Sequence, residues 1–473
     1  MTTQLSRRRF LEMTGIGAAA LTLPGAFAAE QRRKPNIVVI VSDDHGYGSV
    51  GCQGLKHIPT PGIDSIAKAG VRFTNGYVTC PVCSPTRAGL MTGRYQQRFG
   101  HEDNPGPIPA AAPNFGLPES EKTLADYLKE QGYATGVVGK WHLGHRPACH
   151  PNKRGFDEFY GFLHGAHSYT DPGIGGLDPI QRNGKPVDEK EYLTDAFARE
   201  AVSFIERHKA EPFFLYLPFN AVHSPLEAPE RYAKSFEGVT GPKARKWAGQ
   251  LKAMDDAVGR VLGALRKSGV EEETLVFFLG DNGGYPLGNL DLNAPLSGRK
   301  GDTYEGGVRV PFMMQWKGHL PAGTVYGKTV SSLDVLPTAV VAAGGKPAAN
   351  VEGVDLLPFV EQKRTGTPHE ALYWRFVERS GARHGRCLEI GWGAGPLSLQ
   401  LARLTDLDLI VVGHDIDAVK VIAAEARAQG LADRIQAITC DEAHLLLRDH
   451  SVDYVCGHAG GAIWEDVSAV YRE

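Results

Sequence analysis

The chain is poor in cysteine, in net charge of either sign and in long apolar runs, and each shortage excludes a class of protein. Seven cysteines among 473 residues are too few for a disulfide scaffold. A formal net charge of −3 provides neither a basic surface for nucleic acid nor an acidic tail. Apolar residues make up 42% and charged residues 22%, the balance of a soluble globular protein. The length predicts two or three units.

The N-terminus has the ordered features of an export signal. Arg7, Arg8 and Arg9 precede Phe10-Leu11 and an apolar run over 16–23, which is too short to span a bilayer. Ala26 and Ala28 then offer small residues at positions −3 and −1 of a cleavage point. A basic, disordered N-terminus would explain the arginines alone but not the order of the three features. We therefore interpret residues 1–28 as a twin-arginine signal. It predicts a periplasmic or secreted protein, exported by the twin-arginine machinery and without a stable membrane span.

Buried-strand patterns alternate with helical patterns through most of the chain. Short apolar, β-branched runs occupy 35–42, 134–138, 212–217 and 274–279. Helical patterns occupy 120–131, 194–208 and 246–268, and a further helix is expected at 332–338. This alternation predicts an α/β fold with a mixed, mainly parallel sheet flanked by helices.

Polar side chains follow all four predicted strands. Because ligands bind at the carboxyl ends of strands in an open α/β sheet, we expect these side chains to converge. Helix capping is the alternative for an isolated Asp or Asn, but an adjacent pair with a distant Asp-Asn favours a shared site. Oxygen ligands of this kind suit Ca²⁺ or Mg²⁺ better than zinc. The residues concerned are Asp43, Asp44, Lys140, His142, His223, Asp281 and Asn282.

Cationic side chains are expected beside these oxygen ligands. Arg87, Lys140 and Lys300, together with the two histidines, would form a positive pocket for a tetrahedral anion. A single lysine or histidine is more often a solvated surface residue. Their position after strand ends favours the pocket.

The stretch CPVCSPTR, residues 80–87, allows three interpretations. A redox C-x-x-C pair would have its reactive cysteine at a helix start, where the pKa is lowered. Half of a zinc site would need a second Cys/His cluster at ligand spacing, and the sequence contains none. The third interpretation starts from an asymmetry: Cys83 is followed by Pro85 and Arg87 at fixed spacing, whereas Cys80 is not.

The motif from Cys83 to Arg87, continued to Arg94, resembles the signature of the type I, formylglycine-dependent sulfatases, in the alkaline-phosphatase-like superfamily. Separated motifs agree with this family and occur in its order: 43–48, 139–144, 223–225, 280–284, and Lys300 with 304–311. The resemblance covers about 35–376. It implies a catalytic domain over 34–378 that acts as a sulfuric ester hydrolase, similar to arylsulfatases or N-acetylgalactosamine-6-sulfatase.

The resemblance also implies a nucleophile and a metal. A formylglycine-generating maturation enzyme would convert Cys83 to an aldehyde. One hydroxyl of the aldehyde hydrate would attack sulfur, and the other would expel sulfate during release. The hydrate and the substrate sulfate would both lie at a Ca²⁺ ion. The implied protein ligands of Ca²⁺ are Asp43, Asp44, Asp281 and Asn282.

Roles for the remaining site residues follow from the same resemblance. Arg87 would orient the hydrate, while Lys140 and Lys300 would hold the sulfate oxygens. His223, helped by Lys300, would protonate the leaving alcohol. His142 would help to deprotonate the second hydroxyl, and Asp281 would assist the attacking one.

The pattern changes near residue 383. Residues 369–376 are expected to form the first strand of a terminal subdomain that is otherwise largely missing. Residues 386–396 then read as a strand, a G-x-G-x-G turn and a helix start, followed by apolar runs at 407–412 and 435–439. The segment 383–473 resembles the N-terminal half of a class I S-adenosylmethionine-dependent methyltransferase, a partial Rossmann-like unit. The implied cofactor residues are Gly391, Gly393, Gly395, Asp415 and Asp441.

This segment is too short for a complete domain of that kind. We interpret it as a fusion or a truncated reading frame whose methyltransferase-like part is inactive. Four functions are therefore carried forward: hydrolysis of sulfate esters, most naturally on sulfated carbohydrates; hydrolysis of phosphate esters with a Ser or Thr nucleophile and two zinc ions; methyl transfer from S-adenosylmethionine; and binding by a catalytically impaired fusion protein.

Overall fold

The computed structural model describes residues 33–105, 116–176, 178–233, 236, 238–287 and 290–374. In the C-terminal region it describes 384–390, 406–413, 416–439 and 454–457. The predicted signal, residues 1–28, lies outside these ranges. Among the described helices, none combines the length and the apolar character that a membrane span requires.

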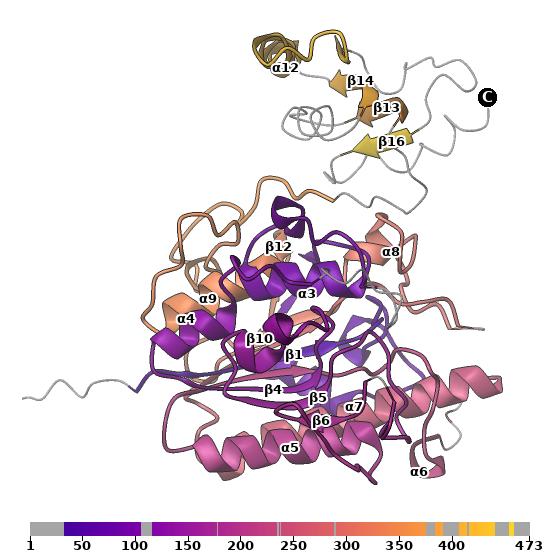
Figure 1. Cartoon of the computed structure of the whole chain (residues 1–473), viewed down its shortest axis with the longest axis vertical. Coiled ribbons are helices and arrows are strands. Elements are labelled where there is room, and N and C mark those ends of the chain that lie inside the picture. Colours follow the sequence, from indigo (N-terminus) through magenta and orange to yellow (C-terminus); the bar gives the residue numbers. More distant parts are fainter. Residues whose placement is uncertain are drawn as a thin grey trace, which may run out of the picture. The chain divides into compact units, whose positions relative to one another are not determined.

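A ten-stranded sheet forms the centre of the body built from residues 35–374 (Figure 1). Its strand order is β11-β2-β10-β9-β1-β8-β4-β5-β6-β7. The five central strands from β9 to β5 are mutually parallel, and β10 joins them antiparallel. The predicted mixed, mainly parallel sheet is therefore confirmed. The strands are β1 (Asn36–Ser42), β2 (Val71–Phe73), β4 (Ala134–Lys140), β5 (Glu158–Phe162), β6 (Gln181–Arg182), β7 (Lys185–Pro186), β8 (Phe213–Pro218), β9 (Thr274–Gly280), β10 (Phe312–Gln315) and β11 (Thr324–Tyr326). A separate pair joins β3 (Gly76–Tyr77) to β12 (Val330–Ser331).

Helices cover both faces of the large sheet, which explains why its central strands are mainly apolar. Val38 and Ile40 of β1 pack with α2, α5 and α7 on one face. The alternate residues of β1 pack with α3, α4 and α9 on the other face, as the two-residue period of a strand requires. The helices are α2 (Pro61–Ala69), α3 (Cys83–Thr92), α4 (Leu124–Glu130), α5 (Leu193–His208), α6 (Glu230–Ala233), α7 (Pro242–Lys267), α8 (Glu305–Val308), α9 (Val335–Ala342) and α10 (Leu357–Val360). Short 3₁₀ turns are η1 (Gly51–Gln53), η2 (Gln96–Phe99), η3 (Pro147–Cys149), η4 (Pro151–Lys153) and η5 (Ser332–Asp334).

Two predicted elements differ from the structure. The helix expected at 332–338 is a 3₁₀ turn that continues into α9, because the Asp334 carboxylate caps the turn by accepting from the Ser331 N–H at 2.8 Å. The strand expected at 369–376 is absent from its described part, 369–374. There Trp374 donates its indole N–H to the Val78 carbonyl at 2.6 Å, and Leu372 packs against β3 and α8. Side-chain anchoring therefore replaces ladder hydrogen bonds.

The C-terminal region contains a four-stranded parallel sheet of its own. Its order is β15-β14-β13-β16, and α12 (Ile416–Ala428) follows β14 along the chain. The three strands predicted here therefore form, in a parallel arrangement. The strands are β13 (His384–Ile390), β14 (Asp406–Gly413), β15 (Ile435–Thr439) and β16 (Tyr454–Gly457). The five residues predicted to bind S-adenosylmethionine, Gly391, Gly393, Gly395, Asp415 and Asp441, lie outside the described residues.

Candidate active site

The carboxyl ends of β1 and β9 bring the predicted carboxylates together. Ser42 pairs with Gly280 in the parallel register, so Asp43 and Asp281 leave the sheet side by side. The Asp44 backbone N–H donates to Asp281 Oδ1 at 3.1 Å. Asp44 holds a positive φ of 54°, a conformation that Asp tolerates better than most residues. This turn directs two successive carboxylates toward one site.

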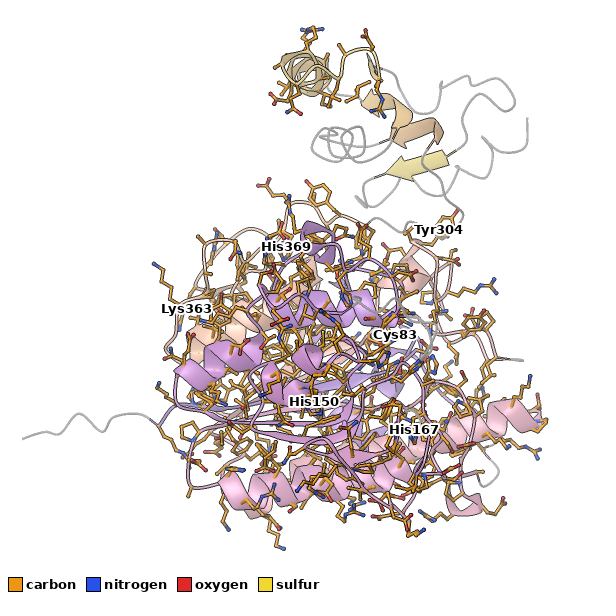
Figure 2. The ribbon with its side chains drawn as sticks, viewed as in Figure 1. Cys83, His150, His167, Tyr304, Lys363 and His369 are labelled. Carbon is orange, nitrogen blue, oxygen red and sulfur yellow. The ribbon has the colours of Figure 1, made fainter. Side chains whose placement is uncertain are left out.

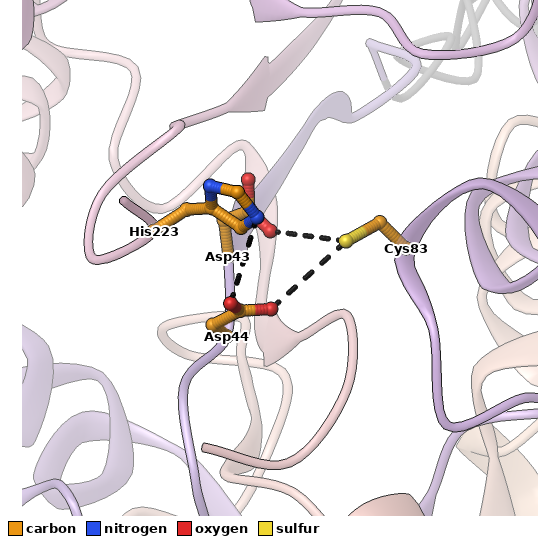
Figure 3. A group of neighbouring side chains, drawn as sticks. All are labelled: Asp43, Asp44, Cys83 and His223. Carbon is orange, nitrogen blue, oxygen red and sulfur yellow. Dashed lines mark hydrogen bonds and ion pairs between the residues drawn. The ribbon is translucent and has the colours of Figure 1, made fainter. Parts of the chain in front are cut away.

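Cys83 faces these carboxylates from the first residue of α3 (Figure 3). Its Sγ lies 3.4 Å from Asp43 Oδ1 and 4.0 Å from Asp44 Oδ1. One ligand atom from each of Asp43, Asp44, Cys83 and His223 lies within 4.8 Å of all the others. Pro85 is in the first turn of α3, where its missing N–H breaks no helical hydrogen bond.

The structure does not favour the redox interpretation of CPVCSPTR. This interpretation required a lowered cysteine pKa, but burial, reinforced by Asp281 and Asp43, raises the pKa of the Cys83 thiol well above its usual range. Burial likewise raises the pKa of Cys80 to about 12. Both thiols are free. The helix start does not lower the pKa because a thiolate here would be buried among carboxylates.

Three buried or half-buried cations neutralise the three carboxylates. Arg87 donates from Nε and Nη2 to Asp281 Oδ2 at 3.0 and 2.7 Å. The Lys140 ammonium lies 2.5 Å from Asp43 Oδ2, and the Lys300 ammonium lies 2.7 Å from Asp44 Oδ1. Arg87 Nη1 also donates to the Lys140 carbonyl at 3.0 Å, which ties α3 to β4.

The carboxylates respond to this environment in different ways. Burial alone would raise the pKa of Asp43, but Lys140, His223 and Arg87 together hold it below its usual value. Burial is similarly overcome at Asp44, whose pKa is lowered by His223 and Lys300. At Asp281, burial and the charge of Asp43 outweigh Arg87 and raise the pKa.

The two predicted histidines lie in different settings. His223 has its Nε2 at 3.6 Å from Asp44 Oδ2, while its Nδ1 donates to the Ser224 carbonyl at 2.6 Å. His142 is buried, and its ring stacks on that of His164 at a centroid distance of 6.3 Å. Burial, then the charges of Lys140 and Arg87, hold the pKa of His142 well below its usual value. A neutral imidazole beside two cations has the protonation state of a base.

Asn282 completes the set of oxygen donors. Its Nδ2 donates to Asp44 Oδ1 at 2.8 Å. This leaves Asn282 Oδ1 buried without a hydrogen-bond partner among the described residues. A buried, unsatisfied amide oxygen beside three carboxylates matches the donors that Ca²⁺ takes. The residues present therefore fit a calcium ion.

Several supporting residues escaped the sequence analysis. Asn104 Oδ1 accepts the Ser84 N–H at 2.9 Å, and Ser84 Oγ donates to the His142 carbonyl at 2.5 Å while it meets His101 Nε2 at 2.7 Å. Gly165 lies so close to His142 that a Cβ there would fall 2.5 Å from Nε2. Ser84 stands inside the CPVCSPTR motif, but nothing in one sequence distinguishes His101, Asn104 or Gly165 from ordinary loop residues.

Comparisons with known proteins converge on one family. The family model described as Sulfatase matches residues 35–345. N-acetylgalactosamine-6-sulfatase from Sus scrofa is 35% identical over 76% of this chain and 71% of its own length. The uncharacterized sulfatase YdeN of Escherichia coli is 34% identical over 72% of this chain and 68% of its own. Among solved structures, Ps i-CgsB in complex with k-i-k-neocarrahexaose is 40% identical, with a TM-score of 0.69 over 73% of this chain and 80% of that one.

Proposed function

The chain belongs to the sulfatase family and is a sulfuric ester hydrolase, and we propose that it removes sulfate from sulfated carbohydrates with a formylglycine made from Cys83 and a bound Ca²⁺. Two similar proteins support a carbohydrate substrate. One relative is named N-acetylgalactosamine-6-sulfatase, and one similar structure is a complex with k-i-k-neocarrahexaose. Hydrolysis of sulfate esters follows from the family, whereas the nucleophile, the metal and the residue roles are proposals.

One observation carries the proposed nucleophile. Cys83 Sγ stands at the start of α3, 3.4 Å from Asp43 Oδ1, inside a ring of buried charges, yet its own thiol is held neutral. A neutral buried thiol is a poor nucleophile, so the position is better explained as the origin of an oxygen nucleophile. When present, formylglycine supplies a hydrated aldehyde with one hydroxyl for attack and another for sulfate release.

The charge balance supports an anionic substrate at a metal-loaded site. Asp43, Asp44 and Asp281 contribute three negative charges, which Arg87, Lys140 and Lys300 balance. A bound Ca²⁺ would supply two further positive charges for polarising sulfate oxygens. The site would then carry a net positive charge that the sulfate ester partly offsets. Asp43, Asp44, Asp281 and Asn282 would hold the ion.

Proton movements are assigned to the histidines and Lys300. His223 is partly exposed, with 15% of its side chain accessible to solvent, which suits contact with a departing sugar hydroxyl. We assign it, with Lys300, to protonation of that leaving group. His142 is neutral and buried, which suits removal of a proton during sulfate release. Lys140 and Lys300 would turn from their carboxylates toward the sulfate oxygens, and Arg87 would orient the nucleophile.

The decisive experiment is mass spectrometry of the peptide that contains Cys83, taken from protein made in its native host. Conversion replaces the sulfur by oxygen with loss of two hydrogens, so the peptide becomes lighter. A wholly unmodified thiol in active protein would contradict the mechanism. Parallel assays with sulfate and phosphate esters test the reaction itself, and faster phosphate release would favour the alternative hydrolase.

Export remains a proposal that rests on residues 1–28 alone. The ordered arginines, apolar run and small residues support a periplasmic or secreted enzyme, which would meet sulfated polymers outside the cell. N-terminal sequencing of protein from the periplasm or medium tests it, with a start near residue 29 as the expected result.

A further inference from the structure

An exposed tyrosine and an exposed arginine form a pair near the candidate site. Tyr285 is 57% exposed, unusually high for a large aromatic side chain in this structure. The Arg299 guanidinium carbon lies 5.7 Å from the centroid of the Tyr285 ring. This distance is within the range of a cation–π contact, which holds the guanidinium beside the ring.

Chain connectivity fixes how near this pair is to the carboxylates. Tyr285 follows Asn282 by three residues, so their backbones are at most about 11 Å apart. Arg299 directly precedes Lys300, whose ammonium contacts Asp44 at 2.7 Å. The Lys300 N–H donates to the Gly284 carbonyl at 3.2 Å, which joins the two loop segments next to the pair. Tyr285 and Arg299 therefore stand at the edge of the site.

The loop that carries the pair is held by hydrogen bonds at several points. The Asn293 side chain accepts from the Gly284 N–H at 2.8 Å and donates to the Gly284 and Gly298 carbonyls at 3.0 and 3.2 Å. The Gly301 N–H donates to the Pro81 carbonyl at 3.0 Å, which links the loop to the segment before α3. The backbone next to Tyr285 and next to Arg299 is therefore held in place by these hydrogen bonds.

Arg299 also differs from some other exposed arginines in its charge partners. Arg98 and Arg207, for example, form ion pairs with glutamates. Within the described ranges, the Arg299 guanidinium makes no ion pair. The nearby Asp302 carboxylate instead accepts from the Arg299 backbone N–H at 3.1 Å. The guanidinium charge is thus available to an anion.

We propose that Tyr285 and Arg299 form a subsite for a second sulfate group, carried by a sugar next to the one that bears the scissile sulfate. The inference rests on the proposed function, since it assumes a sulfated saccharide in the pocket. A guanidinium binds a sulfate through two parallel N–H donors, and the Tyr285 ring offers an apolar face to a sugar ring. The substrate is therefore a saccharide with more than one sulfate.

A competition experiment tests this subsite without requiring turnover of the competitor. Hydrolysis of p-nitrophenyl sulfate is measured with full-length, aldehyde-bearing protein. The competitors are two matched disaccharides that share a 6-O-sulfated N-acetylgalactosamine, one of which carries a second sulfate on the neighbouring sugar. In the wild-type enzyme the second sulfate is expected to lower the inhibition constant about fivefold, the size of an exposed ion pair.

Variants then test whether Arg299 causes the lower inhibition constant of the disaccharide with two sulfates, and whether Tyr285 binds a sugar of both disaccharides. Arg299→Ala should remove the fivefold difference between the two inhibition constants, and Arg299→Lys should keep part of it. Tyr285→Ala should weaken the binding of both disaccharides, because its ring meets a sugar that they share. Arg364→Ala is the matched control: Arg364 lies 4.7 Å from the Phe359 ring centroid, and its neighbour Lys363 is far from Cys83 in Figure 2. The control should keep the full gain.

The outcomes separate the two proposals. The subsite is overturned if the second sulfate lowers the inhibition constant equally in the wild-type enzyme and in Arg299→Ala, or does not lower it in the wild-type enzyme. In either case sulfate-ester hydrolysis stands. Failure of aldehyde-bearing protein to hydrolyse any sulfate ester overturns the proposed function and the subsite with it. A gain that disappears in Arg299→Ala and weakens with added sodium chloride supports the subsite, because an exposed charge pair is screened by salt.

Discussion

Arg87 and Asp281 connect the helix that carries Cys83 to the strand end that carries the predicted metal ligands. Two guanidinium nitrogens of Arg87 meet one oxygen of Asp281, at 3.0 and 2.7 Å, and both side chains are almost fully buried. The contact fixes the distance between two parts of the site that are far apart in sequence. It also makes each partner costly to remove on its own.

Replacing Arg87 by alanine should therefore destabilise the protein as well as inactivate it. The change leaves the Asp281 carboxylate buried without its main partner, which costs about 3–5 kcal/mol. Urea denaturation measures this loss. Arg87→Lys is the matched control, because it keeps the charge but not the two-nitrogen contact, and it should lose less stability. A wild-type free energy of unfolding in Arg87→Ala would contradict the buried pairing.

The two cysteines of CPVCSPTR should respond very differently to substitution. Cys83→Ala should abolish sulfate-ester hydrolysis, by at least about a thousandfold, with an unchanged circular dichroism spectrum. Cys80→Ala removes one buried sulfur and should cost about 1–2 kcal/mol while keeping the aldehyde at position 83 and most of the activity. Steady-state kinetics and mass spectrometry check both. Comparable activity losses in the two variants would favour a joint role for the pair.

Calcium should stabilise the folded protein and support its activity. An ion that binds only the folded state adds about 2.7 kcal/mol at a hundredfold excess over its dissociation constant. Treatment with EGTA should lower the Tm and stop hydrolysis, and added Ca²⁺ should restore both. Asp44→Asn should weaken the Ca²⁺ response, whereas Asp256→Asn, which alters a half-exposed carboxylate on α7, should not. A Tm that is indifferent to Ca²⁺ in the wild-type protein would refute the metal.

The close approach of Gly165 to His142 gives a test of His142 without changing it. A Cβ at position 165 would lie 2.5 Å from His142 Nε2 and must displace the ring. Gly165→Ala should therefore lower kcat by about tenfold or more while the protein stays folded. At Gly327, an added Cβ meets nothing nearer than 3.7 Å, so Gly327→Ala should leave kcat unchanged. Equal kcat values for both variants would remove His142 from the proposed proton transfers.

His101 should make the protein less stable in mild acid. Burial lowers its pKa from 6.5 to about 4. The unfolded chain therefore binds this proton more readily, so the free energy of unfolding falls as the pH drops below about 6.5, until the loss levels off near 4. His101→Gln removes the titration and keeps an N–H donor for Ser84. Between pH 7 and 5, the free energy of unfolding of His101→Gln should fall by about 2 kcal/mol less than that of the wild-type protein. Above pH 7, the free energy of unfolding should change with pH at the same rate in the two proteins. The same rate in both proteins below pH 6 would contradict the burial effect.

Much of the site could be predicted because buried parallel strands are easy to recognise and their ends meet at one edge. The pairing of Ser42 with Gly280 brings Asp43 and Asp281 together, as the alternating pattern of strands and helices suggested. Lys140 and Lys300 likewise reach these carboxylates.

The supporting residues could not be predicted, because their roles depend on loop conformation. His101 and Asn104 come from one loop and meet Ser84 through side-chain contacts that have no periodicity in sequence. Gly165 matters only because the His142 ring lies against it. The charge effect on Cys83 was also missed: a helix start favours a thiolate, but here burial and two carboxylates dominate.

The burial of Cys83 has a consequence for the order of events in the life of the protein. Only 1% of this residue is exposed, and the Gly301–Pro81 hydrogen bond ties the neighbouring loop over the same segment. Under the proposed mechanism, a maturation enzyme would have to reach the CPVCSPTR segment before α3 packs onto the sheet. Oxidation of Cys83 would then compete with folding in time. A chain that folded first would keep its thiol, whereas a mature chain would unfold and refold without needing the maturation enzyme again.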